Sequence, residues 1–227
     1  MTQKRENVLV SLGVNIAIPA VILMKFSGPD ALGPVWGLVV ALAFPLAYGL
    51  ADFFRRREYN LVSILGVISV LLTGGIGLLE LDPKWIAVKE AAIPGIIGLL
   101  VLGSLKTRFP IVRNLLYNDR IIRVDAVEKA LAENGNGPAF EKTLVVASWM
   151  LAASFFLSSV LNFVLAKVLV TSPPGTTQFN EELGRMTALS YPVIVVPSML
   201  IMMAALFYLF RNIRRLTRLD LEDILRT

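Results

Sequence analysis

The chain has 227 residues, of which 56% are hydrophobic and only 17% charged, and its net charge is +5. A soluble domain carries about 45–50% apolar and about 25% charged residues, so this composition is that of a membrane protein. Cysteine and histidine are absent, which excludes disulfides, zinc sites of the Cys/His type, the usual haem and iron–sulfur ligation, and histidine-based catalysis. An all-oxygen Mg²⁺ or Ca²⁺ site stays open but has no motif, and we expect no catalytic residue, no cofactor and no metal.

Six apolar runs predict an all-α, polytopic membrane protein with six transmembrane helices and short outer loops. A span needs roughly 17–25 predominantly apolar residues, and each run meets that requirement. The first run has no small-x-small cleavage site after it, so we interpret it as an uncleaved helix rather than a signal peptide. We expect one transmembrane domain, 1–227, with spans at about 8–24, 31–54, 61–79, 83–105, 143–170 and 186–210.

The turn before the fourth span carries a helix-start pattern, since Asp82 suits the N-cap and Pro83 the first helical position. The long polar loop 106–142 follows that span, and we expect it to lie on the membrane surface. It contains a short helix-forming stretch at 110–117 and a capping box at 125–128, which predicts a second helix.

Two more polar segments complete the chain. Residues 171–184 are expected to form a loop that turns at 173–175, where Pro-Pro-Gly stands. The tail 211–227 is predicted to continue the sixth span as an amphipathic helix facing lipid, with Arg218 and Glu222 as an i,i+4 pair.

Lysine and arginine are distributed unevenly between the two sides of the predicted membrane. The N-terminus, the loop after the second span, loop 106–142 and the tail hold 17 of the 22. This bias predicts that both termini are cytoplasmic. It also explains the basic composition without nucleic acid as a partner, and the cytoplasmic arginines are expected to attract anionic lipid head groups.

One pattern in the chain resembles a known family. Gly74-Gly75, a short turn, and Trp85 followed by Lys89 resemble the bacterial intracellular septation protein A family of inner-membrane proteins. A second match is Leu161-Asn162-Phe163, followed after a loop by Phe179-Asn180-Glu181. The likeness covers 61–206, although Glu181-Glu182 stand where that family tends to have a second lysine. It implies an inner-membrane protein of cell-envelope integrity or division, without catalytic residues.

Lys89 and Glu90 lie inside the fourth span, where charged side chains are costly. Two interpretations stay open. The pair lines a polar site below the outer interface, or Lys89 extends past Trp85 to the lipid phosphates while Glu90 pairs with it. The candidate polar site contains Lys89, Glu90, Asn162, Asn15, Trp85 and Asn180.

Three functions follow from these observations. The resemblance implies a non-catalytic envelope or division protein, with other envelope proteins as partners and a homo-oligomer left open. The alternative is a small transporter or channel for a solute, ion or lipid, favoured by the intramembrane polar residues and the prolines within the spans. The third is a membrane-embedded enzyme of lipid metabolism, but the chain has no histidine, cysteine or clustered aspartates to carry out its chemistry.

Overall fold

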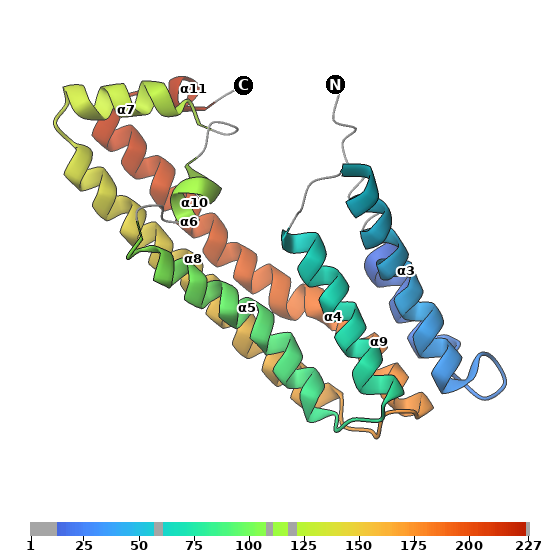
Figure 1. Ribbon diagram of the computed structural model, residues 1–227. Coiled ribbons are helices and arrows are strands. Elements are labelled where there is room, and N and C mark those ends of the chain that lie inside the picture. The colour runs from blue at the N-terminus through green and yellow to red at the C-terminus, as the bar shows by residue number, and fades with distance from the viewer. Residues whose placement is uncertain (1–12, 57–60, 108–110, 118–121, 226–227) are drawn as a thin grey trace. The chain divides into compact units, whose positions relative to one another are not determined.

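The computed structural model describes residues 13–56, 61–107, 111–117 and 122–225 (Figure 1). In these ranges every regular element is a helix, and the one β-type contact is an isolated antiparallel bridge between Ile122 and Leu225. The all-α class is therefore confirmed. The elements, with η for a π-helix, are η1 Gly13–Ala17, α2 Ile18–Lys25, α3 Gly33–Arg56, α4 Leu61–Leu78, α5 Lys84–Ser104, α6 Ile111–Leu116, α7 Val124–Glu133, α8 Gly137–Leu169, α9 Thr177–Ser190, η2 Tyr191–Val195, α10 Val196–Thr217 and α11 Leu221–Ile224.

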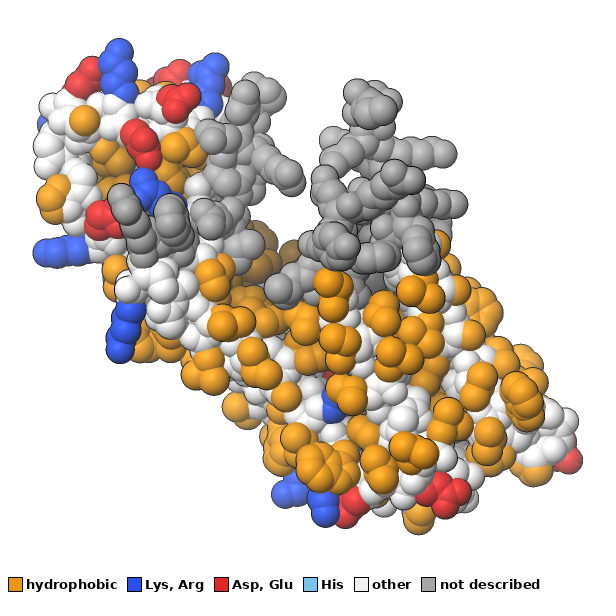
Figure 2. Space-filling view, in the orientation of Figure 1, with side chains coloured by type: hydrophobic (Ala, Val, Ile, Leu, Met, Phe, Trp, Pro, Cys, Tyr) orange, Lys and Arg blue, Asp and Glu red, His pale blue; other side chains and the backbone are white. Residues whose placement is uncertain are grey.

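Four of the described helical stretches are long and apolar enough to cross a membrane. They are Gly33–Ala51, Lys84–Ser104, Gly137–Leu169 and Thr177–Thr217. Two further apolar helices are shorter over their described residues, Gly13–Lys25 and Ile64–Leu78. Figure 2 shows apolar side chains over the long helices, and charged ones gathered around α7 at the upper left and again at the lower edge of the view. The chain thus has the helices of a multi-pass membrane protein.

The chain divides into two compact units, and the first comprises Met1–Ile93 with Val160–Ile194. In it α2 packs against α3 and α9, and α3 also packs against α4. Glycines allow this close approach. A Cβ at Gly184 of α9 would lie 2.9 Å from the carbonyl oxygen of Ala20 and 2.7 Å from Met24 Cγ in α2. Since real Cβ atoms do not come so near, only glycine permits this packing.

The expectation of a loop over 171–184 is wrong in its second half, because α9 begins at Thr177. The hydroxyl of Thr176 accepts a hydrogen bond from the backbone N–H of Phe179 at 3.2 Å and so caps the helix. Phe179 and Leu183 then bury their side chains in the first unit. The predicted turn is present before α9, where Gly175 has a φ of +82°.

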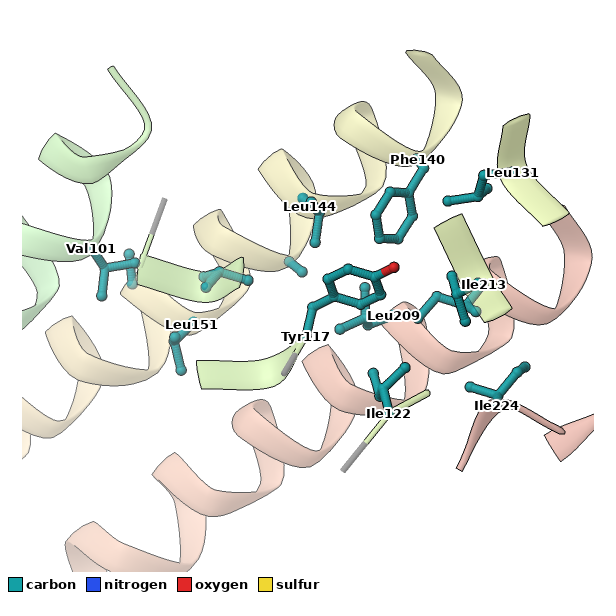
Figure 3. Close-up of a cluster of buried hydrophobic side chains, with 14 residues drawn as sticks. Val101, Tyr117, Ile122, Leu131, Phe140, Leu144, Leu151, Leu209, Ile213 and Ile224 are labelled. Carbon is teal, nitrogen blue, oxygen red and sulfur yellow. The ribbon is translucent and has the colours of Figure 1, made fainter. Parts of the chain in front are cut away.

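The second unit, Pro94–Ser159 with Val195–Thr227, contains a small packed region that we call the head. It consists of α6, α7, α11, the first turns of α8 and the last turns of α10. Tyr117 lies among side chains of α8 and α10, and its ring centroid is 4.9 Å from that of Phe140 (Figure 3). Leu144, Leu209 and Ile213 are buried in the same cluster. The head therefore has its own hydrophobic core.

The helices predicted in loop 106–142 are confirmed, but the capping box is wrong. The residue before α7 is Arg123, and no side chain caps that end. The apolar face of α7 is held instead by packing, because Val127 and Leu131 are buried in the head. Contact of the head with a bilayer stays a prediction.

The tail also differs from the expected continuous helix facing lipid. Arg218 has a φ of 62°, which ends α10 and separates it from α11. In place of the predicted pair with Glu222, the structure has an ion pair between Arg214 and Asp220, at 3.2 Å. Ile213 and Ile224 are fully buried in the head. The tail is thus bound to the protein through its apolar side.

Candidate functional site

The candidate site lies in the hairpin of α4 and α5, within the first unit. The turn between these helices is closed at Asp82, whose carboxylate accepts a hydrogen bond from the Lys84 N–H at 2.9 Å. The hydrogen bonds from Lys84 hold the pKa of Asp82 below its ordinary value. The predicted cap is therefore present, with the helix starting at Lys84. Lys89 follows five residues later, a rise of about 7.5 Å into the helix.

The Lys89 ammonium is held by acceptors from both helices. Its Nζ lies 2.7 Å from Thr73 Oγ1 and 3.1 Å from Ser69 Oγ in α4, with the Ser69 carbonyl oxygen at 3.4 Å. In α5 itself it lies 2.6 Å from Glu90 Oε1. A lysine ammonium has three N–H donors, and Thr73, Ser69 and Glu90 supply an acceptor for each.

This arrangement solves the problem of burying a charge. The Lys89 side chain is only 5% exposed, whereas that of Glu90 is 24% exposed. An unpaired charge in such a place would be strongly unfavourable, but a hydrogen-bonded pair of opposite charges is tolerated. The cluster of Lys89, Glu90, Ser69 and Thr73 therefore has no net charge. It is closed in the sense that every N–H of the ammonium has an acceptor within the cluster, and we call it the Lys89 centre.

The geometry decides between two orientations of Lys89. Its ammonium points to α4 and is not extended past Trp85 towards lipid phosphates. Trp85 lies one turn earlier on α5 and is 50% exposed. The expected pairing of Glu90 with Lys89 is present.

Asn180, another candidate, belongs to a different cluster. Its side chain is buried, and its amide donates to Ser27 Oγ at 3.0 Å and to the Pro34 carbonyl oxygen at 2.7 Å. The hydroxyl of Thr177 donates to the Ser27 carbonyl oxygen at 3.1 Å. These bonds join α9 to the connection between α2 and α3, through Ser27, and to the first turn of α3, through Pro34. Asn180 thus ties helices together.

The remaining candidates, Asn162 in α8 and Asn15 in η1, are half-buried, and each has an interaction partner. Asn162 and Lys89 belong to the same unit, Asn162 in α8 and Lys89 in α5. Its membership of a site with Lys89 stays a prediction.

Sequence reasoning missed Ser69 and Thr73. A signal for them exists, because they stand four residues apart on one face of an otherwise apolar helix. It also missed the role of Glu182, whose carboxylate accepts hydrogen bonds from both backbone N–H groups of Thr171 and Ser172 at 2.8 Å. Glu182 therefore closes the connection between α8 and α9.

In comparisons with protein families, curated proteins and solved structures, nothing matches this chain.

Proposed function

We propose that this protein is a non-catalytic, multi-pass component of a bacterial inner membrane that supports cell-envelope integrity or division. The observation that carries the proposal is the closure of the Lys89 centre. All three ammonium donors are matched by side chains of the chain itself, so Lys89 joins α4 to α5 and has no donor left for a substrate. The resemblance around Gly74-Gly75, Trp85 and Lys89 supplies the cellular setting.

The proposal includes six spans with both termini cytoplasmic. Helix α4 has 18 residues and so measures about 27 Å, close to the roughly 30 Å of a bilayer core. The first apolar helix is described from Gly13, and in the sequence its apolar run begins at Val8. The lysine and arginine bias supports the orientation. Anionic lipids and other envelope proteins are the proposed partners.

A second candidate function, transport of a solute, ion or lipid, is favoured by a specific feature of the helices. Two π-helical turns are present: η1 leads directly into α2, and η2 lies between α9 and α10; in addition, Pro94 lies inside α5. Such turns occur often at functional sites, and broken helices build binding sites in several transporter folds. Transport would require the Lys89 centre to open and exchange its partners with a substrate.

One pair of experiments tests the proposal. Deletion of the gene should increase cell length or sensitivity to low-osmolarity and detergent stress, and the wild-type gene should restore both. The double variant Lys89→Met with Glu90→Gln removes both charges together and avoids an unpaired one. If the Lys89 centre only joins helices, this variant should complement whenever its membrane level equals wild type.

Two results would overturn the proposed role in the cell envelope. One is a deletion strain with unchanged morphology and stress resistance. The other is a double variant that reaches normal membrane levels and yet fails to complement, which would favour the transport function instead. The single variant Lys89→Arg serves as the control that keeps the charge.

A further inference from the structure

Helix α10 has two opposite faces that follow from a four-residue repeat. Ala205, Leu209, Ile213 and Thr217 are buried in the structure, with 3% or less of each exposed. Residues four apart lie on one side of a helix, so these four form a single buried ridge. The opposite ridge is exposed along its whole length and contains Leu200, Met203, Phe207, Arg211, Arg214 and Arg215.

The exposed ridge changes character abruptly. Leu200 is 67% exposed and Phe207 68%, which is an unusual state for large apolar side chains unless lipid covers them. One turn after Phe207, about 6 Å further along the axis, the ridge becomes cationic at Arg211. Arg214 is paired with Asp220, whereas Arg211 and Arg215 make no ion pair within the described part of the chain.

We propose that this ridge of α10 binds one anionic phospholipid of the cytoplasmic leaflet. The phosphate lies between Arg211 and Arg215, which are one turn apart, and the acyl chain follows Phe207 and Leu200 along the helix. The ligand needs an anionic group and an apolar chain joined end to end, and the ridge presents the complementary groups in that order. This inference rests on the proposed orientation, with the end of α10 on the cytoplasmic side.

A second copy of this chain fits the same ridge poorly. Two parallel copies of α10 in contact here would place Arg211 and Arg215 against their own equivalents, and like charges in contact repel. An antiparallel arrangement would place these arginines against the apolar part of the ridge, within the hydrocarbon core of the bilayer, where charged side chains are costly. Charge complementarity therefore selects a lipid phosphate.

The test measures lipid retained by the purified full-length protein. Native mass spectrometry is run with added phosphatidylglycerol, and with phosphatidylcholine carrying the same acyl chains. The double variant Arg211→Gln with Arg215→Gln is compared with Lys129→Gln with Lys142→Gln, a matched loss of two exposed charges elsewhere in the second unit. A basic residue near an anionic surface contributes a factor of about five, so the first variant should bind phosphatidylglycerol about 30-fold more weakly.

The control variant should bind phosphatidylglycerol as the wild type does, and Phe207→Ala should bind it several-fold more weakly. Equal losses in both double variants would overturn the site, because only diffuse charge would then act. Unchanged binding in the first variant, or equal binding of phosphatidylcholine by the wild type, would also overturn it. If the double variant does not fold, Arg211→Gln and Arg215→Gln alone should each lose about fivefold. The deletion phenotype is independent of this assay, so the two proposals fail separately.

Discussion

Replacing Thr73 by valine isolates the bond that joins α4 to α5. The Thr73 hydroxyl donates to the Ser69 carbonyl oxygen at 3.0 Å and accepts from Lys89 Nζ at 2.7 Å. Valine has nearly the same shape and removes both. Hydrogen bonds to charged groups contribute about 1.5–3 kcal/mol in soluble proteins, whereas interhelical ones in membranes average about 0.6 kcal/mol and reach about 1.7 kcal/mol. Because the acceptor serves a buried ammonium, we expect a loss of about 1–2 kcal/mol.

A matched control exists in α9. The Thr187 hydroxyl also donates to the carbonyl oxygen four residues earlier, that of Leu183, at 2.8 Å, and Thr187 is half-buried as Thr73 is. No hydrogen bond to another helix is recorded for Thr187 in the described residues. The difference between Thr73→Val and Thr187→Val therefore reports the contact with Lys89 alone.

The assay is unfolding of the detergent-solubilised protein, followed by the loss of the monodisperse peak after heating or on addition of SDS. Thr73→Val should unfold more easily than Thr187→Val, and Thr73→Ser, which keeps the hydroxyl, should resemble the wild type. Equal stabilities of the two valine variants would refute the reasoning, because the Lys89 ammonium would then not depend on Thr73.

Two further predictions concern packing and topology. Gly184→Ala places a Cβ 2.9 Å from the Ala20 carbonyl oxygen and should lower the unfolding free energy by about 1–3 kcal/mol, whereas Gly66→Ala, where a Cβ meets nothing within 4 Å, should be neutral or slightly stabilising in the same melting assay. Equal effects of these two alanines would contradict the close contact between α2 and α9. A reporter fused after Thr227 should indicate the cytoplasm, while reporters inserted at Gly28 and Gly175 should indicate the outside. An outside C-terminus would contradict the six-span orientation.

The helices could be predicted from the sequence because long apolar stretches have few other ways to satisfy their backbone groups in a membrane. The start of α9 could not be found by the same argument. Asn180, Glu181 and Glu182 lower its hydropathy, so its first turns resemble a loop. The pattern that holds it is amphipathic, since Phe179 and Leu183 share a face and are buried.

The Lys89 centre could be predicted only in part. Lys89 and Glu90 stand out because ionised side chains within a span are expensive, and their pairing follows from that expense. Ser69 and Thr73 do not stand out in the same way, because hydroxyl groups bond to their own helix and are tolerated in spans. Which face of α4 meets Lys89 depends on helix packing, which periodicity alone does not specify.

The same reasoning about the cost of burial predicted that Asn180 belongs to the candidate polar site, but in the structure its amide bonds to partners outside the Lys89 centre. A buried amide needs partners, and Asn180 finds them in Ser27 and Pro34. The sequence shows that such a residue is costly to bury. It does not show whether the partner is a substrate or another helix.

Three hydrogen bonds within the described residues link one helix to another, and together they bear on function. Lys89 bonds from α5 to α4, Asn180 from α9 to the Pro34 carbonyl oxygen in α3, and the Ser154 hydroxyl from α8 to the Ser198 carbonyl oxygen in α10 at 2.7 Å. Each joins a donor in one helix to an acceptor in another segment of the same unit. A transport site must release such bonds at every cycle, at the cost of leaving a buried donor unmatched. A protein that only maintains its shape has no such step. The bonds of Lys89 therefore favour the proposed role in the cell envelope over transport, and the complementation test with both charges removed separates the two.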